Sequence, residues 1–134
     1  MMKVMIDTNI FISAALFPNG RTAAAFQKAL IFPWEPVACD YVIEELHRKF
    51  QEKFPTKIAD LDIFLSSALS VIEVVTTPKT IHSKEPLVRD KKDQPILRAA
   101  ISAKVDYLLT GDKDFLEANL DNPHIISVAN FLLL

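Results

Sequence analysis

The stretch Lys3-Val4-Met5-Ile6-Asp7-Thr8-Asn9 opens the chain with a short apolar run that ends at an acidic residue. Short runs rich in Val and Ile are typical of buried strands, so residues 3–6 are predicted to form one. Asp7 would then lie just past the end of that strand. Ligands of open α/β sheets bind outside the carboxyl ends of the strands, which makes Asp7 a candidate functional residue. In the plainer interpretation, Asp7 only caps the helix that follows.

Strands and helices alternate along the rest of the sequence. Apolar runs predict strands over 36–39, 71–76, 105–110 and 124–126. Helical periodicity predicts helices over 9–16, 21–32, 41–54, 57–70 and 94–104. Asp40 is expected to cap the third of these helices. Short helical segments are expected after Gly111 and over 128–134, with a long loop over 77–92. This alternation indicates a single α/β domain over 1–134, a three-layer α/β/α sandwich with a mostly parallel sheet.

The composition narrows the classes of function. The formal net charge is −2, which argues against holding nucleic acid by a bulk positive field but allows phosphate to be bound through a metal ion. No apolar stretch approaches the roughly 18 residues of a membrane span, and Asp7 interrupts the first run too early for a signal peptide. The single cysteine, Cys39, excludes an internal disulfide. The expected location is therefore cytoplasmic, without a membrane.

Further acids follow other predicted strands or lie in the helices after them. Right-handed crossovers place successive strand-to-helix turns at one edge of a sheet, so Asp112 is expected beside Asp7. Asp93 opens the helix that follows the long loop and is expected at the same edge. Glu44 and Glu45 both lie off the centre of the apolar face of their helix, so helix geometry alone does not choose between them. Each acid also has a plainer interpretation, as a helix cap or a solvated surface group.

Four segments, in this order and with ordinary spacing, resemble the PIN domain family, especially its branch of toxins from toxin–antitoxin pairs. They are MIDTN at 5–9, YVIEEL at 41–46, RDKKDQPILRA at 89–99 and YLLTGDKDF at 107–115. The resemblance covers nearly the whole chain. It implies a PIN-like α/β/α fold and a ribonuclease that depends on Mg²⁺ or Mn²⁺.

The resemblance also implies roles for individual residues. Carried over position by position, the catalytic acids are Asp7, Glu45, Asp93 and Asp112, and the three aspartates among them are the metal ligands. Glu45 is favoured over Glu44 because it directly precedes a Leu. The serine that this branch often carries after its second strand is replaced here by Cys39 or Asp40. Supporting roles are expected for Thr8, Asn9, Thr110, Asp90, Asp114 and Glu44.

These acids suggest a hydrolytic mechanism. Asp7 and Asp93, helped by Asp112, would hold a hard divalent cation, and Glu45 would orient or deprotonate the attacking water. The expected partners are RNA, an antitoxin protein and further copies of the chain in a homodimer or higher oligomer, with Phe32 and Trp34 as candidate dimer contacts. Candidate RNA-binding residues are Arg48, Arg89, Lys91, Lys92 and Lys113.

Two other functions remain open from the sequence. A strand-end Asp is also the nucleophile of haloacid-dehalogenase-like phosphatases and of receiver domains. The phosphatases usually need a second Asp where this chain has Asn9, and no convincing set of receiver residues is present. The other alternative is a catalytically weak or inactive PIN-like module that binds RNA or protein, against which the four acids count.

Overall fold

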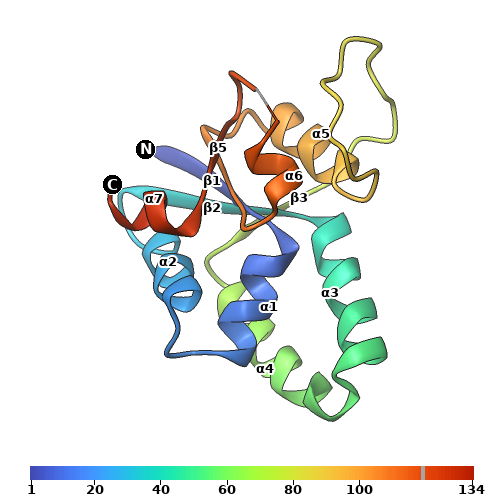
Figure 1. The fold of residues 1–134 in the computed structure, drawn as a ribbon. Coiled ribbons are helices and arrows are strands. Elements are labelled where there is room, and N and C mark those ends of the chain that lie inside the picture. Colours follow the sequence, from blue (N-terminus) through green and yellow to red (C-terminus); the bar gives the residue numbers. More distant parts are fainter. Residues whose placement is uncertain (119) are drawn as a thin grey trace.

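The computed structural model describes residues 1–118 and 120–134 and shows a five-stranded sheet with helices on both faces (Figure 1). All the strand pairings are parallel, in the order β3-β2-β1-β4-β5, which confirms the predicted three-layer α/β/α fold. The strands are β1 (Met2–Ile6), β2 (Trp34–Cys39), β3 (Glu73–Val75), β4 (Tyr107–Leu109) and β5 (His124–Ile126). The helices are α1 (Thr8–Leu16), α2 (Arg21–Ala29), α3 (Asp40–Lys53), the 3-10 turn η1 (Pro55–Lys57), α4 (Ile58–Ala68), α5 (Gln94–Ser102), α6 (Lys113–Leu116) and α7 (Val128–Leu132).

The strand order reverses at β1, in the centre of the sheet. After β1 the chain adds β2 and β3 on one side, and it then returns to add β4 and β5 on the other. Helices α1, α2 and α4 lie on one face, and α5 and α6 lie on the other (Figure 1). Sheets of this kind bind ligands at the carboxyl edge where the order reverses. Ile6 pairs with Leu109 at that point, so Asp7 and Thr110 follow their strands side by side.

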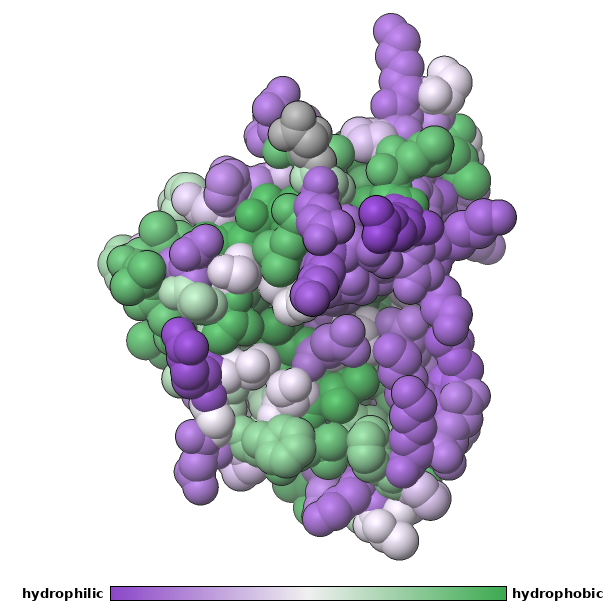
Figure 2. Space-filling model, viewed as in Figure 1, coloured by the Kyte–Doolittle hydropathy of each residue, from purple (hydrophilic) through white to green (hydrophobic). Residues whose placement is uncertain are grey.

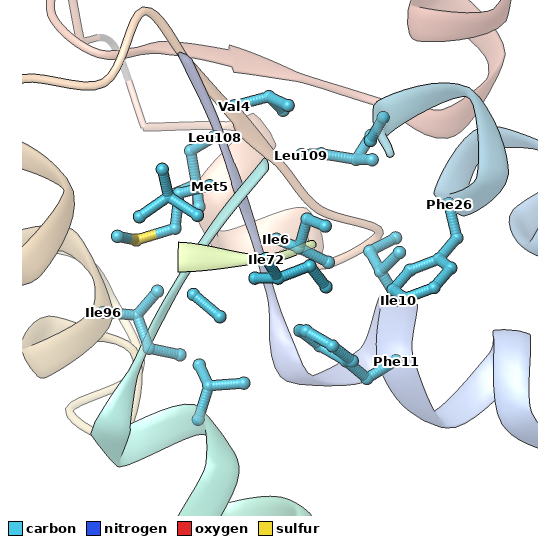
Figure 3. Packing of buried hydrophobic residues seen from close by; sticks show 14 of the residues in the cluster. Val4, Met5, Ile6, Ile10, Phe11, Phe26, Ile72, Ile96, Leu108 and Leu109 are labelled. Carbon is cyan, nitrogen blue, oxygen red and sulfur yellow. The ribbon is translucent and has the colours of Figure 1, made fainter. Parts of the chain in front are cut away.

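The core forms on both faces of β1, which explains why its sequence is a continuous apolar run. Met5 and Ile6 are fully buried, and because side chains alternate along a strand they face opposite layers. Figure 3 shows Met5 on the side of Ile96 in α5, with Ile6 on the side of α1. The rings of Phe11 and Phe26 pack edge to face at 5.3 Å between centroids, which joins α1 to α2. Among the described residues, no helix combines the length and apolarity needed to cross a membrane.

Some predicted boundaries were wrong. α2 ends at Ala29 rather than at residue 32, β2 begins at Trp34 rather than at residue 36, and β3 and β4 are each shorter than predicted. The predicted cap at Asp40 was also wrong, because Asp40 is the first residue of α3 and Cys39 holds the cap position. Asp40 Oδ1 instead accepts hydrogen bonds from the Thr77 backbone N–H at 2.9 Å and from the Thr77 hydroxyl at 2.6 Å. The hydroxyl bond is the main cause that lowers the pKa of Asp40.

The predicted long loop over 77–92 is present, and hydrogen bonds to α5 hold its second half in place. The Gln94 side-chain amide donates to Glu85 Oε2 and to the Pro86 carbonyl, both at 2.7 Å, and its oxygen accepts from the Val88 N–H at 3.0 Å. Arg98 Nε donates to Glu85 Oε1 at 2.8 Å. These bonds hold the loop against the start of α5, in front of which Asp90 and Asp93 lie.

Replacing Glu85 with Ala is expected to lower the free energy of unfolding by about 3–5 kcal/mol. The substitution leaves the guanidinium of Arg98, whose side chain is only 14% exposed, without its carboxylate partner. Urea unfolding followed by circular dichroism measures the change. Glu52→Ala, at an exposed position of α3, is the matched control and should stay within about 0.5 kcal/mol of the wild type. Equal stability of the two variants would contradict this role for Glu85.

Candidate metal centre

Asp7 is buried at the junction of β1, β4 and α1. Its Oδ1 accepts the Thr8 N–H, its Oδ2 accepts the Thr110 hydroxyl, both at 2.7 Å, and it holds the cap position of α1. Its backbone N–H continues the strand pairing by donating to the Leu109 carbonyl at 3.1 Å. Asp7 is therefore both a helix cap and an acid at the strand end, so the two interpretations of the sequence are compatible.

The surroundings of Asp7 make its charge costly. Burial raises the pKa of Asp7 to about 6, although the hydrogen bonds from Thr110 and Thr8 favour the charged form. The negative charges of Asp112 and Glu45 raise it further. A positive ion at this point would reverse the effect, because it favours the carboxylate.

The structure places Glu45, and not Glu44, at this edge of the sheet. Glu45 is buried, whereas Glu44 is exposed. One oxygen of Glu45 accepts the Thr8 hydroxyl, and the other lies 3.5 Å from the guanidinium of Arg48. The resemblance favoured Glu45, but helix geometry alone left the choice open. In the structure Ile43 is only partly buried, and the buried face of α3 carries Glu45 together with Val42, Leu46 and Phe50.

Asp93 lies with Asp90 and Asp112 in a group whose ligand oxygens are all within 4.8 Å of one another. Asp93 holds the cap position of α5, yet its side chain makes no capping hydrogen bond. Its Oδ2 is buried and has no hydrogen-bond partner among the described residues. Burial is the largest cause that raises the pKa of Asp93, to about 8. The hydrogen bond with the Asp112 carboxyl and the negative charges of Asp7, Asp112 and Asp90 raise this pKa further. The charges of all three neighbouring aspartates therefore disfavour ionisation of Asp93.

Thr110 connects the two halves of the site. Its hydroxyl donates to Asp7 Oδ2, and its oxygen accepts the Asp112 N–H at 3.0 Å. Asp112 also caps α6 by accepting the Asp114 N–H at 2.8 Å. Asp114 is partly buried and lies 3.7 Å from the guanidinium of Arg89. The positions of Asp7 and Asp112 are therefore set by the ends of adjacent strands.

The supporting residues predicted from the sequence divide into two groups. Thr8, Thr110, Asp90 and Asp114 lie in or beside the group of acids. Asn9 and Glu44 are exposed. Asp90 is closer to the centre than its supporting role implied, because the turn at Lys91 and Lys92 brings it back onto Asp93. That turn is closed by the Asp93 N–H, which donates to the Asp90 carbonyl at 3.0 Å.

Two of the predicted RNA-binding residues contact acids at this edge of the sheet. Arg48 contacts Glu45 and Arg89 contacts Asp114, so both guanidinium groups border the site. Figure 2 shows hydrophilic residues gathered over α3 and the segments beside it. All five residues are exposed: Arg48, Arg89, Lys91, Lys92 and Lys113.

The acids fit a hard divalent cation. Mg²⁺ and Mn²⁺ prefer oxygen ligands, and every donor in the group is a carboxylate. A buried carboxylate oxygen without a partner is costly unless a cation or water satisfies it, and Asp93 Oδ2 is in that position. The residues that could hold the ion are Asp93, Asp112 and Asp90, with Asp7 next to them.

Comparison with known proteins shows the family to which the chain belongs. An uncharacterized protein of Methanocaldococcus jannaschii is 28% identical over 131 residues, which cover 92% of this chain and 79% of that protein. The fold is similar to that of a chain in the crystal structure of VapBC2 from Rickettsia felis bound to a DNA fragment from the promoter. The two chains superpose with a TM-score of 0.69 and 20% sequence identity, and the match covers 94% of this chain and 98% of the other. A chain in the structure of DNA-bound VapBC from Salmonella typhimurium is similar to this chain with a TM-score of 0.69 and 16% sequence identity. That match covers 96% of this chain and 99% of the other. A sequence model of the PIN domain matches residues 3–114, and the chain therefore belongs to the PIN domain family.

Proposed function

We propose that this protein is a ribonuclease that hydrolyses RNA phosphodiester bonds and depends on Mg²⁺ or Mn²⁺. The observation that carries the proposal is the buried Oδ2 of Asp93, which has no hydrogen-bond partner in the part of the chain that the structure describes. Asp93 is grouped there with Asp90 and Asp112. Membership of the PIN domain family supports it and removes the alternatives that belong to other α/β folds. The non-catalytic alternative stays open to the tests below.

The aspartates would hold the divalent ion, with Asp93 and Asp112 as central ligands and with Asp90 and Asp7 beside them. The bound ion would supply charge stabilisation to the phosphate as the phosphodiester bond breaks. Thr110 fixes Asp7 and Asp112 relative to each other, so the ligands are positioned before substrate binds.

Glu45 would take the proton of the attacking water. One of its oxygens is held by the Thr8 hydroxyl, which fixes the direction of the carboxylate. The guanidinium of Arg48 lies 3.5 Å from the other oxygen. Thr8 is thus a positioning residue, because it orients Glu45 and is itself the first residue of α1.

Glu45→Gln is expected to lower the rate of RNA cleavage by about 10²–10⁴-fold, the usual contribution of a general base. Gln keeps the shape and can still accept the Thr8 hydroxyl, but it cannot take a proton. Single-turnover cleavage of a labelled RNA measures the rate. Glu44→Gln is the matched control on the next residue and should stay within about twofold of the wild type, because Glu44 is exposed. Larger loss in the Glu44 variant would contradict the assignment.

Cleavage of a mixed RNA pool tests the function itself. The protein is incubated with the pool in excess EDTA, and then with Mg²⁺ or Mn²⁺ in excess of the chelator. Cleavage is expected only with free metal, and sequencing of the product ends identifies the preferred site. Binding of the pool without cleavage under every metal condition would favour the non-catalytic alternative.

We also propose that the protein acts in the cytoplasm as the toxin of a toxin–antitoxin pair. Two structurally similar chains come from VapBC complexes bound to DNA, which supports the idea of a protein partner. Induced expression in a bacterial host should then arrest growth, and the arrest should be lost with Asp7→Asn. Unchanged growth despite accumulation of active enzyme would contradict the toxin role.

A further inference from the structure

A cavity of about 610 Å³, which we call the α5 cavity, lies between the long loop over 77–92 and the exposed side of α5. That volume is within the range of small-molecule binding sites, roughly 300–1,000 Å³. The loop stands away from the sheet beside α5 in Figure 1. Six of the side chains on the walls of the cavity are polar or charged and are Thr80, His82, Lys84, Glu85, Arg98 and Ser102. The α5 cavity is separate from the group of acids, because those acids do not line it.

One wall of the α5 cavity is held in a fixed geometry. Arg98 Nε donates to Glu85 Oε1 at 2.8 Å, and Arg98 Nη2 donates to Glu85 Oε2 at 3.3 Å. This two-point contact fixes the plane of the guanidinium group. The Gln94 side-chain amide also donates to Glu85 Oε2 at 2.7 Å, so the carboxylate is itself held in place. The cavity therefore presents a flat cation that is ordered before a ligand arrives, which lowers the entropic cost of binding.

The walls of the α5 cavity combine the groups that bind an unstacked nucleobase. Bases of single-stranded RNA stack on His rings or on Arg guanidinium planes, and they form hydrogen bonds through their edges. His82 and Arg98 supply such flat surfaces here, and the hydroxyl groups of Thr80 and Ser102 supply donors and acceptors. Lys84 is exposed and adds a positive charge for the phosphate of the same nucleotide. The lining thus fits a nucleotide better than it fits a purely apolar molecule.

The α5 cavity lies within reach of an RNA strand that occupies the group of acids. Asp93 caps α5, and Arg98 and Ser102 follow it on the same helix. At about 1.5 Å per residue, they lie about 8 Å and about 14 Å further along the helix axis. Successive nucleotides of a stacked strand are about 3.4 Å apart, so this span corresponds to about two to four nucleotides. The part of the loop between the cavity and Asp93 carries three exposed cations: Arg89, Lys91 and Lys92.

We propose that the α5 cavity binds one nucleobase of the RNA strand, about two to four nucleotides from the phosphodiester bond that is cut. This inference rests on the proposed ribonuclease function and gives the enzyme a means of choosing where it cuts, because base contacts specify sequence. The charge of the walls favours RNA as the occupant. Lys84 and Arg98 carry two positive charges against the one negative charge of Glu85, whereas the whole chain has a net charge of −2.

Amide NMR spectra of the isotope-labelled protein test the site without any need for cleavage. In excess EDTA, the protein is titrated with each of the ribonucleoside 5′-monophosphates in turn and, in a separate arm, with inorganic phosphate. At least one of the nucleotides is expected to shift the amide signals of residues 80–85 and 98–102, and phosphate alone should leave most of these signals in place. The proposal is overturned if no nucleotide shifts them, or if phosphate shifts them equally.

A substitution that fills the α5 cavity tests its role directly. Ser102→Leu adds a larger side chain at the last residue of α5, and the hydrogen bonds of Gln94 and Arg98 that hold the loop stay in place. It should weaken nucleotide binding by at least about 10-fold, in line with the usual contribution of stacking one base. Ser66→Leu, at an exposed position of α4, is the matched control and should bind within about twofold of the wild type. Unchanged binding in Ser102→Leu would overturn the proposal.

The cleavage pattern connects the α5 cavity to the reaction. The sequenced products of the wild type should show a base preference about two to four nucleotides from the cut. Ser102→Leu should lower that preference by at least about 10-fold, and Ser66→Leu should keep it. A preference that survives in Ser102→Leu would sink the inference even though the enzyme cleaves RNA. Nucleotide binding in the cavity without cleavage under any metal condition would support the nucleotide site and contradict the ribonuclease, so the two failures give different results.

Discussion

Asp7→Asn is expected to lower metal-dependent RNA cleavage by more than about 100-fold while leaving the fold intact. Loss of supporting groups around a metal costs about 10–100-fold, and Asp7 carries one of the charges that the ion would neutralise. The Asn oxygen can still accept the Thr8 N–H, and its amide can donate to the Thr110 oxygen in place of the present bond. Single-turnover cleavage and circular dichroism measure the two effects.

A matched substitution separates the site from general charge effects. Asp60→Asn removes the same charge from an exposed position of α4 and should cleave RNA at the wild-type rate. Full activity of Asp7→Asn would show that the acids do not act as proposed. Loss of activity in both variants would point to bulk charge rather than to the group around Asp93.

Raising the pH from about 5 to about 9 is expected to destabilise the metal-free protein. Asp7 and Asp93 have folded pKa values of about 6 and about 8, both above the ordinary 3.8. Between pH 4 and these folded pKa values, the two carboxyl groups are protonated in the folded state but ionised in the unfolded chain. The folded state therefore binds more protons, and a lower pH favours folding. The free energy of unfolding should therefore fall, by on the order of a few kcal/mol, as the pH rises through 6 and 8.

Divalent metal should reverse this loss. Mn²⁺ at 100 times its dissociation constant adds about 2.7 kcal/mol when it binds only the folded state, and it binds best where the carboxylates are charged. The thermal midpoint with and without Mn²⁺ at each pH measures the effect. Asp93→Asn should flatten the pH dependence and remove most of the metal effect, whereas Glu44→Gln should change neither. An Mn²⁺ effect that survives in the Asp93 variant would contradict this account.

Much of the fold followed from local patterns in the sequence. The short apolar run over residues 3–6 predicted a buried strand, and β1 is the central strand of the sheet. The residues at which strands end were less predictable, because hydrogen bonding to the neighbouring strand determines them. β3 keeps only Glu73–Val75 of a longer β-branched run, since it is an edge strand that pairs with β2 alone. Asp40 resembled a cap in sequence, but its partner Thr77 is 37 residues away.

Part of the candidate site could also be predicted from local patterns in the sequence. Asp7 and Asp112 follow strands directly, so the topology alone brings them to one edge of the sheet. Helix geometry alone left Glu44 and Glu45 open, and only the resemblance favoured Glu45. The packed α3 buries Glu45 and leaves Glu44 exposed. Asp93 resembled a simple cap, and only the folded structure shows that its side chain makes no capping hydrogen bond and that its buried Oδ2 has no partner among the described residues. The closeness of Asp90 likewise depends on a turn that the sequence pattern did not reveal.

Anomalous diffraction from crystals soaked in Mn²⁺ is the most direct test that these acids form a metal centre. The account predicts a strong peak among the carboxylates of Asp93, Asp112 and Asp90 or Asp7, and loss of that peak in Asp93→Asn. Absence of any peak there, or a peak only at exposed acids elsewhere on the surface, would contradict the central claim.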